Sequence, residues 1–461
     1  MMGMLVLLAI EAVLATAALT AARGRQVTAA LYLLALTAPL EIYRTSVGGV
    51  NVSLFRLSLA LAALALALHW RSCVRSSLSQ IDWTLPAAYC ALAVAIGVAL
   101  ALNPVNTFLG GRLLATVVIG VVSVVVVALL VRQTSLEELA RALIFACVLP
   151  IVAASWQALG PRVGAEATLP LVSELAVAEG LEVSTAPPAV VDGLSARTKG
   201  TFGDPNHYGT FLMVSLVTGL ALTGTAVRDK DRLRAATGGA ACFAIALSLI
   251  STYSRTAWLA TVGAVLLLSV LVRPRLRPLV QSRRSQVALV LTCLAGIGVA
   301  VPVLPNLRER IDPSATVNQG TNEAHEGTAR AALDAFAESP VWGTGPGALG
   351  AELAQGKRTS GAHSTYLTAA AELGTLGLVA VLVAAWLVLS NLMKFRRGRG
   401  RVTTRAIGAA FAAAYAGFLL ANLTYDLWYD DFHWLLAGAA SSAIGAFQPH
   451  GSTASRYVTA A

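Results

Sequence analysis

The chain has 461 residues, of which 56% are hydrophobic and only 13% are charged, and its mean hydropathy is +0.69. Such a chain could not keep its apolar surface out of water as a soluble globule, so the composition excludes that class and indicates a polytopic membrane protein. The net charge of +10 is also compatible with nucleic-acid binding, but the basic residues form loop-end clusters without interleaved aromatics, and we expect no nucleic-acid partner.

Runs of mostly apolar residues predict the membrane spans, because crossing a bilayer takes about 20 such residues in a helix. Thirteen candidates occur, and since the second, the eighth and the last are the weakest, twelve spans would also fit. They lie near residues 4–22, 27–43, 52–70, 83–102, 109–131, 142–160, 205–227, 235–250, 255–272, 287–304, 376–393, 406–424 and 432–448. The predicted fold is therefore all-α, with about 12 to 13 spans.

The basic residues predict the orientation of these spans, because short cytoplasmic loops retain Lys and Arg. Alternate connections and the C-terminal tail hold 22 of the 34 basic residues, all on one side of the predicted arrangement. We place that side in the cytoplasm and both long loops outside. The first span has no basic residues before it, so we expect it to be retained rather than cleaved. None of the five cysteines falls in a predicted outer loop, so we expect no disulfide framework there.

Two connections are too long to be simple turns, and loops of that length are usually functional or disordered. They divide the chain into six parts. These are N-terminal helices at 1–160, a first external loop at 161–204, central helices at 205–304, a second external loop at 305–375, C-terminal helices at 376–448 and a cytoplasmic tail at 449–461. The second loop is predicted to carry short helices and catalytic residues.

The first external loop ends in SARTKGTFGDPNHYG, which predicts the start of a helix. Asp204 is a plausible N-cap, Pro205 suits the first helical position, and Asn206 lies beside it. Helix N-termini attract anions, and Arg197 and Lys199 lie a few residues upstream. These residues indicate an anion site at the outer membrane face; the alternative is a solvated basic pair beside an ordinary capped helix.

Two further arginines lie in predicted external segments. Arg255 is the only formal charge in STYSRTAW (251–258), close to the hydrocarbon edge, where a guanidinium usually faces a cavity or a partner or else snorkels to the head groups. The run TARAALDAFAESP predicts a short surface helix that carries Arg330 and ends before Pro340. GTGPG then predicts a tight turn. GALGAELAQGKRT is not a phosphate loop, since the spacing between the two glycines of that motif is one residue too long here and no strand precedes the segment.

The segment GAHSTYLTAAAELGTLG (361–377) carries a lone histidine. If the helix is continuous, Gly374 and Gly377 lie below His363 on one face and leave a groove for another helix or a lipid chain. An interfacial histidine above a small-residue packing seam is the alternative. Farther on, the acids and aromatics of YDLWYDDFHW (425–434) predict an interfacial belt that caps a span; the alternative is that Asp426, Asp430 and Asp431 bind a cation or orient a substrate.

Together these motifs resemble the O-antigen ligase family of polytopic membrane glycosyltransferases, which includes lipopolysaccharide O-antigen ligases and related polysaccharide polymerases. The family signature is His, then Asn, Ser or Gln, nine residues, Gly, two residues, and Gly, Thr or Tyr. His363, Ser364, Gly374 and Gly377 match it.

Three upstream elements resemble the family in the same order. RTKGTFGDPNHYG is similar to its Arg-x-x-Gly-x-x-x-Asn-Pro-Asn element, with Asp204 in place of the first Asn. YSRTAWL is similar to its Ser-Arg-Gly-x-Trp element, with Thr256 where Gly is common. PVWGTGPG matches its Pro-x-x-Gly-x-Gly-x-Gly turn. The likeness covers about 195–380, whereas the first 190 residues match only as a hydrophobic pattern.

The resemblance implies a GT-C-like enzyme of the cytoplasmic (inner) membrane that works on its external side in cell-surface polysaccharide biosynthesis. Its donor would be a glycan on a polyprenyl diphosphate, and its acceptor a hydroxyl on a glycan, a lipid or another molecule. No metal or other cofactor is implied. His363 would be the general base, while Arg255, Arg330, Arg197 and Lys199 would bind the diphosphate. Ligase and polymerase are not distinguished, and a flippase or a non-catalytic scaffold is an alternative.

Overall fold

The computed structural model describes residues 2–23, 25–47, 50–69, 75–104, 107–159, 197–280, 316–349, 362–397, 401–428 and 430–443. These residues are almost entirely helical, which confirms the all-α prediction. Nine of their helices are long and apolar enough to cross a membrane, and two shorter apolar helices accompany them. The predicted span at 287–304 lies outside the described residues.

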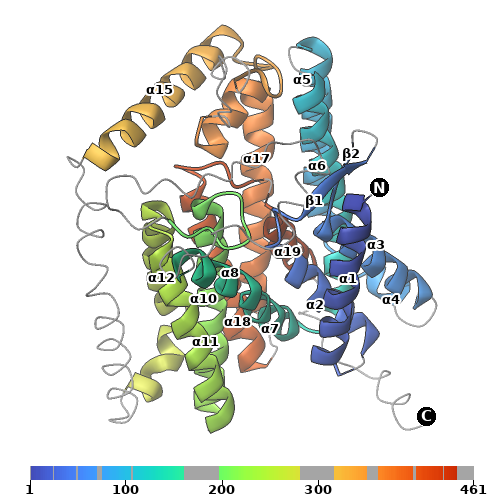
Figure 1. Ribbon diagram of the computed structural model, residues 1–461, viewed down its shortest axis with the longest axis vertical. Coiled ribbons are helices and arrows are strands. Elements are labelled where there is room, and N and C mark those ends of the chain that lie inside the picture. The colour runs from blue at the N-terminus through green and yellow to red at the C-terminus, as the bar shows by residue number, and fades with distance from the viewer. Residues whose placement is uncertain are drawn as a thin grey trace.

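The helices form an elongated bundle in which the N-terminal and central groups flank the long helix α17 (Figure 1). The N-terminal half holds α1 (Met2–Ala21), α2 (Gln26–Thr37), α3 (Leu54–Leu68), α4 (Arg75–Leu78), α5 (Thr84–Leu102), α6 (Thr107–Gln133), α7 (Leu136–Ala146) and α8 (Val148–Leu159). The C-terminal half holds α10 (Pro205–Arg228), α11 (Arg232–Ser251), α12 (Arg255–Val280), α15 (Thr316–Glu338), α17 (Thr365–Arg397), α18 (Val402–Ala421) and α19 (Asp431–Ser441). The strands β1 (Arg44–Val47) and β2 (Val50–Ser53) pair in an antiparallel hairpin, with Arg44 opposite Ser53.

Short polar side chains define several helix starts. Asp204 adopts an extended backbone conformation, and its side chain accepts a hydrogen bond from the Asn206 amide, while Pro205 occupies the first turn of α10. This confirms the start predicted from GDPN. Ser135 caps α7 in the same way, since its hydroxyl accepts from the amide of Glu138. Such caps fix where each membrane helix emerges from the bundle.

Helix α15 lies at one end of the molecule, against the first part of α17 (Figure 1). It spans Thr316–Glu338 and ends before Pro340, as predicted, but it is much longer than the short helix expected around Arg330. The next residues form the predicted turn, in which Gly343, Gly345 and Gly347 have positive φ angles of 74°, 106° and 78°.

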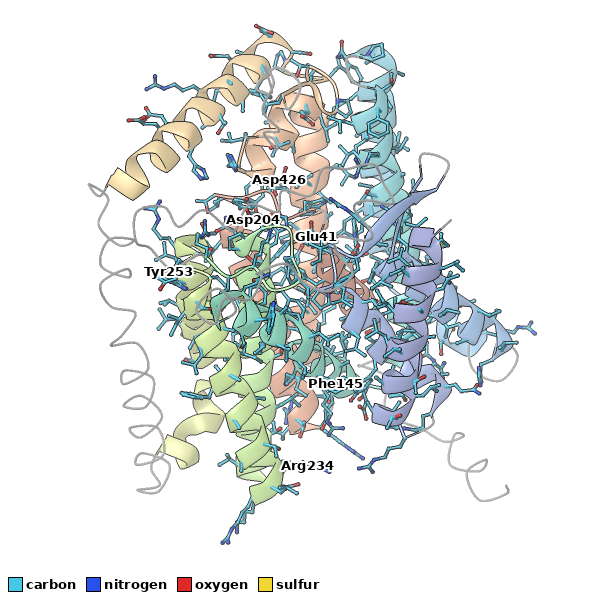
Figure 2. All side chains as sticks on the ribbon, viewed as in Figure 1. Glu41, Phe145, Asp204, Arg234, Tyr253 and Asp426 are labelled. Carbon is cyan, nitrogen blue, oxygen red and sulfur yellow. The ribbon has the colours of Figure 1, made fainter. Side chains whose placement is uncertain are left out.

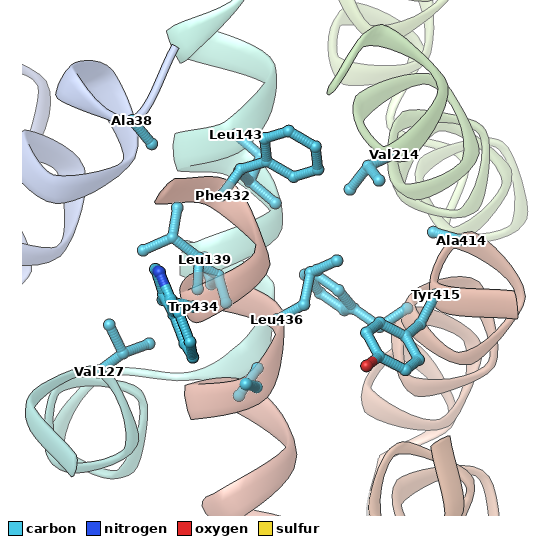
Figure 3. Close-up of a cluster of buried hydrophobic side chains, with 14 of the residues drawn as sticks. Ala38, Val127, Leu139, Leu143, Val214, Ala414, Tyr415, Phe432, Trp434 and Leu436 are labelled. Carbon is cyan, nitrogen blue, oxygen red and sulfur yellow. The ribbon is translucent and has the colours of Figure 1, made fainter. Parts of the chain in front are cut away.

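Helix α19 lies inside the bundle, where Phe432, Trp434 and Leu436 pack among side chains of neighbouring helices (Figure 3). Trp428, just before this helix, is also buried, and His433 is fully buried with its Nε2 atom 2.8 Å from the Tyr89 hydroxyl. The prediction of an interfacial belt at 425–434 is therefore wrong for Trp428, Phe432 and Trp434, which are buried in the bundle. Aromatic and acidic residues are typical both of interfaces and of polar-lined cores, and the sequence alone does not separate the two.

Candidate functional site

Four irregular segments meet at one end of the bundle, beneath α15. They are 197–204 before α10, 252–254 between α11 and α12, 362–364 before α17, and 422–428 with Asp430 between α18 and α19. We call this the site end. Figure 2 shows Asp204, Asp426 and Tyr253 at this end and Arg234 at the opposite end. Polar segments from distant parts of the chain are thus brought together at one end.

The side chain of Asn206 joins two of these segments. Its Oδ1 accepts a hydrogen bond from Arg197 Nη2 at 3.1 Å and another from Ser254 Oγ at 2.6 Å. Arg197 is also anchored through Nε, which donates to the Thr252 carbonyl at 3.0 Å. Arg255 follows directly as the first residue of α12 and is half-buried. Two of the arginines predicted to bind a diphosphate therefore lie on segments that are hydrogen-bonded to each other.

His363 lies just before α17, with a positive φ of 50° and a half-buried side chain. Its ring centroid is 4.6 Å from that of His325 on α15 and 5.6 Å from that of Tyr425. Ser364 is buried, and its hydroxyl donates to the Asn422 carbonyl at 3.4 Å. The segment at 362–364 is thereby tied to the end of α18, with the imidazole between two other rings.

Gly374 breaks α17, with φ 66° and ψ −166°, so the predicted alignment of Gly374 and Gly377 beneath His363 on one continuous face is wrong. A Cβ on Gly374 would lie 2.3 Å from the Val341 carbonyl oxygen. A Cβ on Gly377 would lie 2.1 Å from the Cβ of Leu373, across the break. Gly374 therefore allows the start of α17 to pack tightly against the turn after α15, while Gly377 makes room for Leu373 across the break.

Tyr425 connects the histidine to the first helix turn of α10. Its hydroxyl donates to Asp204 Oδ2 at 2.6 Å, and the His207 ring stands perpendicular to its own ring at a centroid distance of 5.3 Å. His207 Nδ1 in turn lies 2.6 Å from Oδ1 of the buried Asp430. The rings of His325, His363, Tyr425 and His207 thus form a row across the site end.

Burial is the largest influence on the protonation of three members of this row, His325, His363 and Tyr425. It lowers the pKa of His363 below the usual histidine value, while the negative charge of Asp204 acts in the opposite direction. The pKa of His325 is lowered by burial and by the nearby His363 and Arg255. Burial, together with Asp204, raises the pKa of the Tyr425 hydroxyl. His363 is therefore neutral near pH 7, the form that can accept a proton.

Two of the predicted site residues are exposed. Arg330 on α15 has a side chain 75% exposed and forms an ion pair with Glu326 of the same helix at 2.5 Å. The Lys199 side chain is exposed, although its backbone amide donates to Gln157 Oε1 at 3.0 Å. The network around Asn206 is built without their side chains. Within the described ranges, no group of three or more His, Cys, Asp or Glu residues is arranged to hold a metal ion.

The sequence motifs missed three members of the ring row. His325, Tyr425 and His207 come from different elements, and only the folded chain brings them to His363. His207 carried a faint signal, since it directly follows the DPN cap of α10. Tyr425 and His325 carried no such signal, because nothing in the sequence around either residue relates that residue to His363.

The fold and the site end define a polytopic α-helical membrane protein with His363 and Arg197 on irregular segments and Arg255 at the first position of a long helix. A model of the O-antigen ligase family matches residues 240–382, about a third of the chain, and this stretch includes Arg255, Arg330 and His363. No curated protein matches the chain. The chain therefore carries an O-antigen ligase domain over these residues, which confirms the resemblance drawn from its motifs.

Proposed function

We propose that the protein transfers a glycan from a polyprenyl-diphosphate donor to an acceptor hydroxyl, with His363 as the general base. The observation that carries this proposal is the surroundings of His363. The imidazole is half-buried, its pKa is held below the usual value, and it lies beside His325, whose pKa also responds to Arg255. A neutral base next to a cationic segment suits a reaction in which a hydroxyl loses a proton and an anion departs.

The proposed step forms a glycosidic bond and breaks the glycosyl phosphate bond of the donor. The acceptor oxygen attacks the anomeric carbon of the donor while its proton passes to His363. The bond between that carbon and the diphosphate oxygen breaks, and its electron pair leaves with the diphosphate. Arg255 and Arg197 stabilise the developing charge, because a guanidinium can hold two phosphate oxygens at once. His363 then releases its proton to water.

The arginines differ in how well they are held in place. Arg197 is fixed by Thr252 and Asn206, so its guanidinium is preorganised for an anion that approaches the start of α10. Arg330 and Lys199 are exposed, and we assign them to capture of the donor rather than to the reacting bond. The chemistry proposed in this way uses no metal ion and no nucleotide sugar.

We place this reaction on the external side of the cytoplasmic membrane, with the bilayer supplying the lipid-linked donor. The basic connections support this orientation, since Arg234 in the connection at 228–234 lies at the end opposite to Asp204 (Figure 2). A ligase and a repeat-unit polymerase would share this chemistry and differ only in the acceptor. Mass spectrometry of envelope glycans from a deletion strain separates them: a lost chain-length distribution points to polymerisation, and a lost linkage points to ligation.

The direct test is a transfer assay with purified protein, a polyprenyl-diphosphate glycan, an acceptor glycan or lipid, and EDTA. We expect a new glycosidic bond and one free polyprenyl diphosphate for each glycan transferred. Arg255→Ala and Arg197→Ala should lower the rate, whereas Arg234→Ala, an arginine lost at the opposite end, should not. If the donor moves across the bilayer and no new glycosidic bond forms, the protein is a transporter. If none of the variants changes the envelope glycans, the protein is a scaffold.

A further inference from the structure

The carboxylate of Asp204 has two hydrogen-bond partners, and neither of them requires a negative charge. Oδ1 accepts from the Asn206 amide at 2.6 Å, and Oδ2 accepts from the Tyr425 hydroxyl at 2.6 Å. An asparagine would cap α10 equally well, and its amide nitrogen could donate to the tyrosine oxygen. The similar family element has Asn at this position. The charge of Asp204 therefore needs an explanation other than helix capping.

The Tyr425 ring lies between that charge and His363. The hydroxyl of the tyrosine binds Asp204, while the centroid of its ring lies 5.6 Å from the imidazole centroid, with the two rings tilted by 45°. The hydrogen bond fixes the carboxylate at a set place beside the ring row. At that place the negative charge raises the pKa of His363, against the larger effect of burial. Burial and the charge of Asp204 thus act in opposite directions on the pKa of the His363 imidazole.

Other ionisable groups also face this part of the site end. His325 on α15 packs directly on the imidazole, and Arg255 at the start of α12 acts on His325. Asp426 accepts a hydrogen bond from the Thr365 hydroxyl at 3.0 Å, and burial raises its pKa, which favours its neutral form. On the far side of Tyr425, His207 is paired with Asp430, while Tyr366 lies in the first turn of α17. Asp204 differs from Asp426 and Asp430 because its hydrogen-bond partner, Tyr425, packs directly against His363.

We propose that Asp204 is a positioning residue for His363: held in place by Tyr425, its carboxylate stabilises the imidazolium that forms when His363 takes the acceptor proton. This inference rests on the proposed function and adds a residue to it. The proton moves only from the acceptor oxygen to the imidazole nitrogen. Neither Asp204 nor Tyr425 gains or loses a proton in this step. The carboxylate thus acts on the step in which the positive charge appears, as a fixed charge does in other base-catalysed transfers.

The test compares Asp204→Asn with the wild type in an assay that does not depend on transfer. Diethyl pyrocarbonate reacts with neutral imidazole, so the extent of His363 modification against pH, read by peptide mass spectrometry, gives its titration midpoint. We expect the midpoint of Asp204→Asn to move to lower pH. Glu41→Gln is the matched control, because the Glu41 carboxylate accepts from the Gly203 amide at 3.2 Å, on the neighbouring residue, and should leave the midpoint in place.

In the transfer assay, Asp204→Asn should shift the acid limb to lower pH and lower the plateau roughly 10-fold, a part of the 10²–10⁴ that a general base supplies. Asp204→Ser keeps a helix cap but carries no charge, so it should show the same shift and the same loss of rate as Asp204→Asn. Both variants should unfold at the wild-type temperature, which is the control for folding. An unmoved midpoint in both variants, with transfer intact in the wild type, overturns the role of Asp204 and leaves the proposed function standing. A shifted midpoint without transfer by the wild type overturns the proposed function instead.

Discussion

Replacing Gly374 by alanine should destabilise the protein at the junction between α17 and the turn after α15. Gly374 has φ 66° and ψ −166°, a combination that is essentially restricted to glycine. A Cβ there would also lie 2.3 Å from the oxygen and 2.4 Å from the carbon of the Val341 carbonyl, and 2.6 Å from the Trp342 amide nitrogen. These are backbone atoms, so no side chain can rotate to make room.

The expected cost has two parts. Holding alanine in this backbone conformation costs about 1–3 kcal/mol. Overpacking against Val341 and Trp342 costs about another 1–3 kcal/mol, because the turn itself must shift. The turn is tied to the start of α17 by the Thr344 amide, which donates to the Ala371 carbonyl at 2.9 Å, and by the Gly345 amide, which donates to Glu372 at 3.1 Å. A loss of roughly 2–6 kcal/mol would be a large share of a typical folding free energy of about 5–15 kcal/mol.

The assay is thermal unfolding of the purified protein in detergent, followed by intrinsic fluorescence. Gly374→Ala should unfold several degrees below the wild type. Gly97→Ala is the matched control: it lies within α5, an added Cβ there meets nothing within 4 Å, and alanine should be neutral or stabilise by up to about 1 kcal/mol. If Gly374→Ala unfolds at the wild-type temperature, the break in α17 and the close packing against Val341 are both refuted.

Three further predictions concern the site end. Because burial lowers the pKa of His363, the transfer rate should hold its plateau as pH falls through 6.5 and decline only below it; a pH profile with a midpoint above 6.5 would contradict this. Asp430→Asn removes the partner of His207 from a buried pair and should cost about 3–5 kcal/mol in chemical denaturation, so an unchanged midpoint would argue against the pair. Arg330→Ala breaks only an exposed pair with Glu326, so its melting temperature should match the wild type, and any lost transfer would be a loss of function rather than of fold.

The membrane helices were predictable because hydropathy and caps act locally. The start of α10 follows from Asp204 and Pro205 alone, and the end of α15 follows from Pro340. Helix α19 was predicted as a longer span because its apolar run continues past Ser441, but packing inside the bundle, rather than hydropathy, sets its surroundings. Hydropathy does not distinguish a helix that faces lipid from one that faces other helices.

The site was only partly predictable because its geometry depends on backbone breaks and distant partners. Helical periodicity placed His363 above Gly374, but the histidine precedes the helix with a positive φ and the glycine interrupts it. Asn206 was identified as part of a motif, yet its role in joining Arg197 to Ser254 requires two loops that are about 50 residues apart in the chain. Such contacts are properties of the folded chain and leave no local pattern.

The central claim is that His363 takes the proton in glycan transfer, and one measurement tests it most directly. The initial rate of transfer from a polyprenyl-diphosphate glycan to a hydroxyl acceptor should be compared between purified wild type and His363→Ala, at equal amounts of folded protein. The account predicts transfer by the wild type and a loss of 10²–10⁴, the usual contribution of a general base, in the variant. Transfer by His363→Ala at the wild-type rate would contradict it.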